Sequence, residues 1–237
     1  MIYFSKIVMR ADAPAGHIAP LVHDNAYLDH KALWHLFTGA ATAAPQVFLF
    51  YRIYDDGLPA FYVLSSEMPA VLSEIWLVQC KEYAPRITNG MRLRFVLRAN
   101  PVVTQADEQK RQVRRDVVMV RKHALKQQGV PRDQWPTQNV LVQEECVKWL
   151  RARAKRCGFS LVMREDAAPP FNVQVETCAY RQHELHKRGR APIRFSSVDF
   201  SGILEVIDTA LLLKALTTGI GPAKGFGCGL LLIKPVA

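Results

Sequence analysis

The alternation of hydrophobic and polar residues predicts strands and one short helix in the first hundred residues. A helix is expected over residues 29–37, because Leu33, Leu36 and Phe37 share one apolar face at the 3.6-residue period. Strands are expected at residues 2–9, 47–53, 61–64 and 91–101. The last of these strands alternates arginine with leucine and phenylalanine, so one of its faces should be basic.

Residues 68–80 fit either a helix or a strand. Pro69 can occupy the first turn of a helix, whereas the β-branched residues that follow also suit a strand. We assign a helix. The first hundred residues then follow the order β-α-β-β-α-β, which is the ferredoxin-like order.

The second half repeats this alternation with longer insertions. Residues 104–137 are polar and strongly basic, which indicates a surface excursion, partly mobile. Helices are expected from 144 to 157, before Gly158, and from a cap at Asp208 to about Thr217. Strands are expected at 159–164, 173–182, 193–199, 202–207 and 230–236.

Two tandem modules are the simplest architecture for this element order. We expect an α+β protein made of two ferredoxin-like (RRM-like) domains with antiparallel sheets. The first domain would span residues 1–98 and carry the 29–37 helix. The second would span 99–237 and carry the basic insertion and the glycine-rich stretch GIGPAKGFGCG at 219–229.

Composition narrows the class of partner. The 237 residues carry 31 Lys and Arg against 21 Asp and Glu, a net charge of +10, which favours a polyanion such as nucleic acid. Hydrophobic residues make up 49% of the chain, yet no apolar run is long enough to span a bilayer, so we expect a folded cytoplasmic protein without membrane binding. The start of the chain resembles a first strand and not a signal peptide.

The cysteines argue against a metal site. They are odd in number, scattered and without a CxxC pair, a pattern that suits reduced thiols. They are Cys80, Cys146, Cys157, Cys178 and Cys228. The pair of histidines in HELH, 183–186, lies beside a lysine and two arginines, and a basic RNA-facing loop explains it better than a metal. No metal and no small-molecule cofactor are expected.

The glycine-rich stretch resembles a phosphate-binding loop but stands in the wrong order for nucleotide hydrolysis. A Walker loop needs a strand before it, a helix after it and Ser or Thr behind the lysine, whereas here a helix precedes Lys224 and a strand follows. One alternative is a helix stop followed by a flexible turn. The other is a backbone that passes close to nucleic-acid phosphates, with Lys224 adding charge.

Candidate chemistry lies in NAYLDHKALWHLF, residues 25–37. If the helix begins near Asp24, four side chains form a stripe beside the apolar face: Tyr27, His30, Lys31 and Trp34. If it begins at Asp29, His30 lies in the first turn. Either start puts His30 near a helix N-terminus, which tends to lower its pKa and suits proton transfer near neutral pH. The alternative is that Tyr27 and His30 only pack on the surface.

Several segments together resemble the CasE-type CRISPR repeat endoribonucleases, the RNA-processing subunits of type I-E Cascade. The similar segments are YFSKIVMR, NAYLDHKALWHLF, RLRFVLRANPVVT followed by QKR, and GIGPAKGFGCGLLLI. The resemblance implies two ferredoxin-like domains, a precursor CRISPR RNA hairpin as substrate and other Cascade subunits as partners. It also implies metal-independent cleavage, in which a ribose 2′-hydroxyl attacks the scissile phosphate and leaves a cyclic phosphate and a 5′-hydroxyl. The product would stay bound.

The resemblance also assigns residues. The catalytic histidine of the family falls on His30, and a tyrosine that some members use falls on Tyr27. Part of the family has a supporting lysine at the position that His35 occupies in this chain. His35 lies about 140° around the helix from His30. On geometry we therefore expect Lys31 to supply the cation.

Stem recognition is expected to depend on charge and shape, because A-form RNA hides its base edges in a deep major groove. The candidate RNA-binding residues are Arg98, Lys110, Arg111, Arg114, Arg115, Arg121, Lys122 and Lys224, with Gly219, Gly221, Gly225, Gly227 and Gly229. Two rival functions remain: a non-catalytic RNA-binding scaffold of the same fold, and a basic protein-interaction domain.

Overall fold

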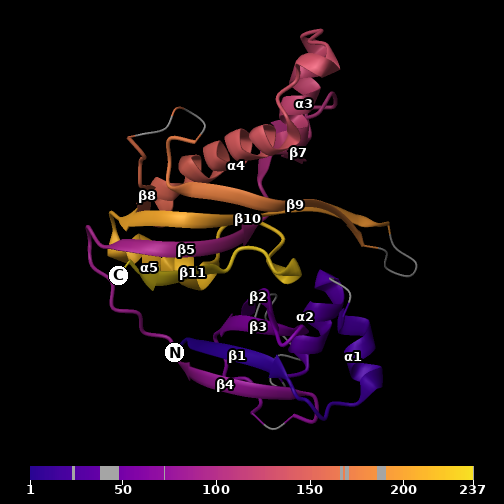
Figure 1. Ribbon diagram of the computed structural model, residues 1–237, viewed down its shortest axis with the longest axis vertical. Coiled ribbons are helices and arrows are strands. Elements are labelled where there is room, and N and C mark those ends of the chain that lie inside the picture. The colour runs from indigo at the N-terminus through magenta and orange to yellow at the C-terminus, as the bar shows by residue number, and fades with distance from the viewer. Residues whose placement is uncertain are drawn as a thin grey trace. The chain divides into compact units, whose positions relative to one another are not determined.

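In the computed structural model the chain forms two compact units, each described here by itself (Figure 1). The structure describes residues 1–22, 25–37, 48–71, 73–165, 168, 171–185 and 191–236. The first unit contains Met1–Arg86, Thr217–Gly219 and Ala223–Leu230. The second unit contains Ile87–Leu216, Ile220–Pro222 and Leu231–Ala237.

The first unit is a four-stranded antiparallel sheet with two helices between its first two strands. Its elements are β1 (Tyr3–Met9), α1 (Ala15–Val22), α2 (Ala26–Trp34), β2 (Phe48–Asp55), β3 (Leu58–Ser65) and β4 (Trp76–Glu82). The strands lie in the order β2-β3-β1-β4. The core of the unit forms between the sheet and α2, where Ile7, Leu33, Phe50 and Phe61 are fully buried.

The prediction of a helix over residues 68–80 is wrong. Among the described residues of 66–75 there is no helix, and β4 begins at Trp76. Trp76 and Val78 are buried while Leu77 between them is half exposed, so the two-residue period decides this segment. Pairing of Trp76 with Met9 on β1 outweighs the helix-start signal of Pro69.

The second unit is built on a sheet of five strands. Its elements are β5 (Arg92–Ala99), β6 (Val102–Ala106), β7 (Gln112–Asp116), α3 (Val117–Gln127), η1 (Arg132–Gln134), α4 (Gln138–Ala154), η2 (Lys155–Cys157), β8 (Phe159–Leu161), β9 (Val175–Leu185), β10 (Ile193–Val206), α5 (Thr209–Thr218), η3 (Lys224–Phe226) and β11 (Leu231–Pro235). Its main strand order is β11-β5-β10-β8, with β9 also paired to β10. Of these elements, η3 and the end of α5 belong to the first unit.

The two sheets share one antiparallel order. With β5, α4, β8, β10, α5 and β11 taken as the six ferredoxin elements, the second sheet is ordered 4-1-3-2, and the first sheet has the same order. The predicted fold class, α+β with two tandem ferredoxin-like domains, is confirmed. The first unit departs from the ideal in placing both of its helices between β1 and β2.

The units divide differently from the expected ranges 1–98 and 99–237. Strand β5 pairs with β10 and β11 and so belongs to the second unit. The cause lies in its apolar face, because Leu93, Phe95 and Leu97 are buried in the sheet that these three strands form. Most of the glycine-rich stretch lies in the first unit.

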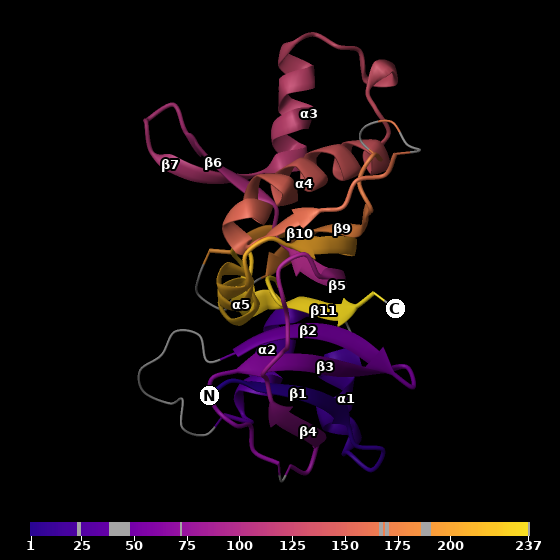
Figure 2. The same cartoon turned by 90° about the vertical axis from the view of Figure 1, so that its left-hand side faces the viewer.

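The basic excursion expected over 104–137 is folded. Strands β6 and β7 form a two-stranded ribbon that leads into α3 (Figure 2). Asp116 joins this insertion to the sheet: its carboxylate caps α3 through Met119 N and also accepts hydrogen bonds from Tyr180 on β9 and Ser196 on β10. The polar sequence did not predict this structure, because a ribbon that buries little apolar surface shows no clear hydrophobic period.

Strand β10 is longer than expected. The strands expected at 193–199 and 202–207 form one strand, Ile193–Val206. Gly202 lies in its middle, where a Cβ atom would come within 2.1 Å of the Gln174 carbonyl oxygen. This glycine permits a close approach of two backbones and does not end the strand.

Candidate active site and RNA-binding surface

Helix α2 places His30 one turn from its N-terminus. Asn25 caps the helix, and its Oδ1 accepts hydrogen bonds from Tyr27 N at 3.1 Å and Leu28 N at 3.3 Å. Of the two helix starts considered, Asp24 lies outside the described residues and Asp29 is already inside the helix. His30 is therefore the fifth residue of α2. The helix dipole acts most strongly on the first turn, and His30 lies just beyond it.

The imidazole of His30 lies against aromatic rings. Its centroid is 5.1 Å from that of Phe48 and 6.2 Å from that of Phe50, both on β2, and 5.6 Å from that of Trp34 on α2. Tyr27 precedes His30 by three residues, so both side chains emerge on neighbouring parts of one helix face. The packing fixes the ring plane while the side chain stays half-buried.

The glycine-rich stretch brings Gly225 to His30. A Cβ atom at Gly225 would lie 4.0 Å from His30 Cε1, and no other atom of the described residues outside its chain neighbours and its own helical turn would lie that close. Both residues belong to the first unit, and η3 contacts α2. The structure thus places a residue without a side chain beside the candidate catalytic histidine, although the two are 195 positions apart in the sequence.

Gly225 differs from the other glycines of this stretch. Gly219, Gly221, Gly227 and Gly229 all have positive φ. Gly227 illustrates their role: its φ is 75°, and a Cβ there would lie 3.1 Å from the Phe50 ring. Backbone conformation explains these four, as the helix-stop-and-turn alternative proposed. Gly225 has no positive φ, so open space beside His30 is what its missing side chain provides.

Lys224 closes the turn. Its Nζ donates a hydrogen bond to the carbonyl oxygen of Thr218 at 2.5 Å, and the side chain lines a cavity of about 320 Å³ with Phe48 and Leu49. Because Phe48 also contacts His30, this cavity lies near the histidine within the first unit.

Lys31 lies on a different side of α2 from the stacked rings. It lines a cavity of about 540 Å³ between α1, α2 and the segment before β4, together with His35. Lys31 and His35 are one turn apart, whereas Trp34 accompanies His30. The structure therefore brings together His30 and Gly225 but groups Lys31, the expected cation, with His35.

Most of the candidate RNA-binding cations lie on the insertion of the second unit. Arg114 and Arg115 are exposed on β7 and point to opposite faces of the ribbon, because they are adjacent in a strand. Lys110 lies in the turn before β7 with φ of 61°, and Arg111 pairs with Asp107 at 2.9 Å.

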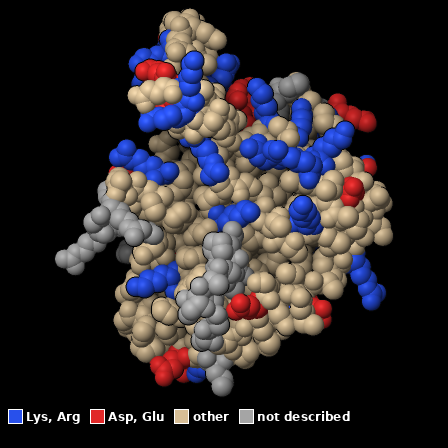
Figure 3. All heavy atoms as spheres, turned by 180° about the vertical axis from the view of Figure 1, so that it is seen from behind, with Lys and Arg blue, Asp and Glu red and all other residues tan. Residues whose placement is uncertain are grey.

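On α3, Lys122 Nζ donates to Gln138 Oε1 at 2.5 Å, and Arg121 lies 3.9 Å from Glu145. Lysine and arginine side chains spread over one face of the molecule, with fewer acidic side chains among them (Figure 3). The insertion thus presents exposed basic side chains whose charge suits a phosphate backbone.

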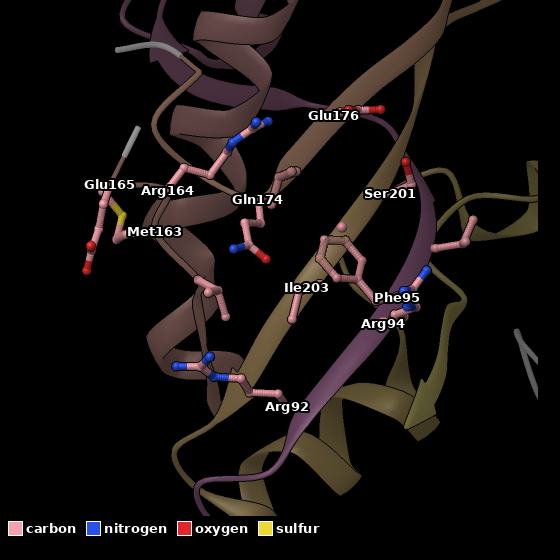
Figure 4. Close-up of a pocket in the computed structure, with 14 residues that line it drawn as sticks. Arg92, Arg94, Phe95, Met163, Arg164, Glu165, Gln174, Glu176, Ser201 and Ile203 are labelled. Carbon is pink, nitrogen blue, oxygen red and sulfur yellow. The ribbon is translucent and has the colours of Figure 1, made fainter. Parts of the chain in front are cut away.

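The basic face of β5 is partly neutralised. Arg98 forms a bidentate ion pair with Asp199 on β10, with N–O distances of 2.7 and 2.8 Å. The two side chains are 22% and 15% exposed. Arg92 on β5 forms an ion pair with Glu205 on β10 at 3.2 Å. Arg92 and Arg94 line a cavity of about 950 Å³ on this sheet face, with Arg164 across it (Figure 4).

Two features escaped the sequence analysis. Arg132 lies 5.8 Å from the centre of the Trp135 ring, beside a cavity of about 750 Å³ that Lys122 also lines. A cation over a half-buried aromatic ring is a common element of surfaces that bind nucleic acid. Asp29 and Arg52 form a buried ion pair in the first unit. The Asp29–Arg52 pair was not predictable, because its residues are 23 positions apart and meet only in the fold. Arg132 and Trp135 are only three residues apart, but their contact depends on the short turn η1, which was not predicted from the sequence.

The HELH segment is only partly described. His183 stacks on Phe195 at 4.5 Å, and its Nε2 lies 2.8 Å from Ser197 Oγ. His186 and the basic residues after it lie outside the described residues. Among the described residues, no group of three or more His, Cys, Asp or Glu side chains has an arrangement that could hold a metal ion. Nor is any described helix both long and apolar enough to cross a membrane.

Two ferredoxin-like units, a histidine packed beside a glycine turn and a basic insertion define a class of α+β protein with a candidate proton-transfer site and a surface whose charge suits nucleic acid. The chain belongs to the family described as CRISPR associated protein, which matches residues 2–235.

The chain resembles known proteins in both sequence and fold. It is 28% identical over 237 residues to the CRISPR system Cascade subunit CasE of Escherichia coli, a match that covers 99% of this chain and 100% of that protein. It is 32% identical over 158 residues to the CRISPR-associated endoribonuclease Cse3 of Thermus thermophilus, or 65% of this chain and 61% of that protein. Its fold matches the structure of Thermus thermophilus Cse3 bound to an RNA representing a pre-cleavage complex, with a TM-score of 0.72, 25% identity and 99% of each chain covered.

Proposed function

We propose that this protein is a metal-independent endoribonuclease that binds and cleaves the hairpin repeats of precursor CRISPR RNA. The observation that carries the proposal is the open space at Gly225 beside His30, which combines a proton-transfer group with a backbone that a phosphodiester can approach closely. Family membership and the relatives named for Cascade and for endoribonuclease activity support the same substrate class.

The proposed reaction needs two proton transfers. The 2′-hydroxyl oxygen attacks the adjacent phosphorus and loses its proton to a base, while the bond from phosphorus to the 5′-oxygen breaks and that oxygen receives a proton. The products are a 2′,3′-cyclic phosphate and a 5′-hydroxyl. His30 is the group able to carry a proton near neutral pH, and Tyr27, one turn earlier, supplies a hydrogen-bond donor.

The basic insertion would hold the stem while the first unit performs the chemistry. Arg114 and Arg115 are exposed candidates on its ribbon, and Lys224 adds charge beside the glycine turn. Tight contacts to many phosphates would keep the cleaved RNA bound, so the enzyme would act close to once per molecule and remain on the RNA as a subunit of cytoplasmic Cascade.

The decisive experiment incubates the protein with a repeat hairpin RNA in EDTA. We expect a single cut that leaves a cyclic phosphate, and no cut when the scissile nucleotide carries a 2′-deoxyribose. Cleavage of the 2′-deoxy RNA would refute the proposed nucleophile. Tight binding without any cut would favour the scaffold function, and the position of Lys31 away from the His30 rings is the observation that keeps this alternative open.

A further inference from the structure

A buried ion pair ties the helix that carries His30 to the strand beneath it. Arg52 Nη1 donates to Asp29 Oδ1 at 2.6 Å, and the two side chains are only 3% and 2% exposed. Arg52 Nη2 donates to the carbonyl oxygen of Leu21 at 2.7 Å. One guanidinium on β2 thus holds both the end of α1 and the first turn of α2.

The same face of β2 contacts the histidine. Phe48, Phe50 and Arg52 are two residues apart, so their side chains emerge on one side of the strand. The rings of Phe48 and Phe50 pack against the His30 imidazole. The Arg52 side chain binds Asp29, the residue directly before His30. The strand therefore contacts both the ring and the backbone turn from which the ring extends.

Stability alone gives little reason for such a pair. Removing two charges from water is costly, and apolar residues of similar size often serve as well or better. Burial opposes the charge on Arg52, but the Asp29 carboxylate, together with Tyr54, outweighs it and raises the pKa of Arg52, so the guanidinium stays charged. What an apolar contact would lack is direction, since a guanidinium fixes its acceptors in a plane.

We propose that Asp29 and Arg52 are positioning residues that orient α2 so that His30 faces the gap at Gly225. This inference rests on the proposed function, because it assigns the pair a role in the cleavage step. A purely structural pair would affect only the fraction of folded protein. A positioning pair would affect the rate of the folded enzyme, because displacing a catalytic group by about 1 Å can cost on the order of 10²-fold.

The test compares single and double replacements. Arg52→Met removes the guanidinium from a buried carboxylate and should lower the melting temperature, whereas Asp29→Leu combined with Arg52→Met replaces both charges with apolar groups and should restore it. Each variant is assayed well below its melting temperature, with excess protein over hairpin RNA. We measure the single-turnover cleavage rate and the RNA dissociation constant.

We expect the double variant to bind RNA within about threefold of the native chain and to cut it on the order of 10²-fold more slowly. Arg52→Lys can reach only one of the two acceptors, so its cleavage rate should lie between that of the native chain and that of the double variant. Val78→Ala is the matched control, because it removes buried atoms of the same unit on β4, at the opposite sheet edge from β2.

A double variant that cuts at the native rate would overturn the positioning role. So would a Val78→Ala variant that slows cleavage as much as the double variant does. If the native chain leaves the hairpin intact, the proposed function fails and this inference fails with it. If the native chain cuts and His30→Ala does not, the function stands and the double variant alone decides the role of the pair.

Discussion

The two units share a strand order but differ in what they add to it. The first unit adds little charge and brings a histidine, aromatic rings and a glycine turn together. The second adds the β6–β7 ribbon and α3, which carry exposed arginines and lysines. Under the proposed function, one copy of the fold would supply the chemistry and the other the affinity for phosphates, and substitutions should separate rate from binding accordingly.

The largest effect expected from this comparison is on the rate. His30→Ala removes the proton-transfer group and should lower the single-turnover cleavage rate by about 10²- to 10⁴-fold. The dissociation constant for the hairpin should change little, because the cationic surface of the second unit is untouched. Quenched cleavage assays and filter binding measure the two quantities separately. Persistent cutting by His30→Ala would move the chemistry away from this helix.

The second prediction tests the gap beside the imidazole. Gly225→Ala places a methyl group in contact with His30 Cε1 without backbone strain, because φ is not positive there. We expect cleavage to slow by on the order of 10- to 100-fold while the melting temperature stays unchanged, since the methyl occupies the space that the phosphate needs.

Gly227→Ala is the matched control for this substitution. It forces alanine to a φ of 75° and crowds the Phe50 ring, so we expect a loss of about 1–2 kcal/mol of stability. If both alanine variants lost stability equally, the distinction drawn between these two glycines would fail.

Binding should respond to the second unit. Arg114→Ala with Arg115→Ala should weaken hairpin binding by about tenfold and reduce the slope of log affinity against log salt by up to about two, one for each lost phosphate contact. Cleavage at saturating RNA should keep its native rate. A slope equal to that of the native chain would show that neither arginine neutralises a phosphate.

The sequence predicted the second unit's core strands and the candidate histidine better than the contacts that make a site. Periods of two and 3.6 located β5 and α4, because burial on one face imposes them. The period could not tell that the apolar face of β5 belongs with β10 and β11, nor that Gly225 meets His30. Those are long-range contacts, and residues such as Asp29 and Arg52 carry no local mark of their pairing.

Arg98 offers the smallest effect and the finest test of the comparison. It is a candidate phosphate ligand by sequence, yet its guanidinium is bound at two points by Asp199. Removing Arg98 alone would leave that carboxylate unpaired, so a loss of affinity could reflect repulsion. The charge-neutral double variant, Arg98→Gln with Asp199→Asn, avoids this difficulty.

Because a partly exposed ion pair contributes about 0–1 kcal/mol, the double variant should fold normally. We expect it to bind the hairpin within about twofold of the native chain with an unchanged salt slope, since a paired arginine releases few counterions from RNA. A slope reduced by about one would instead assign Arg98 a phosphate contact and extend the RNA surface from the insertion onto the sheet.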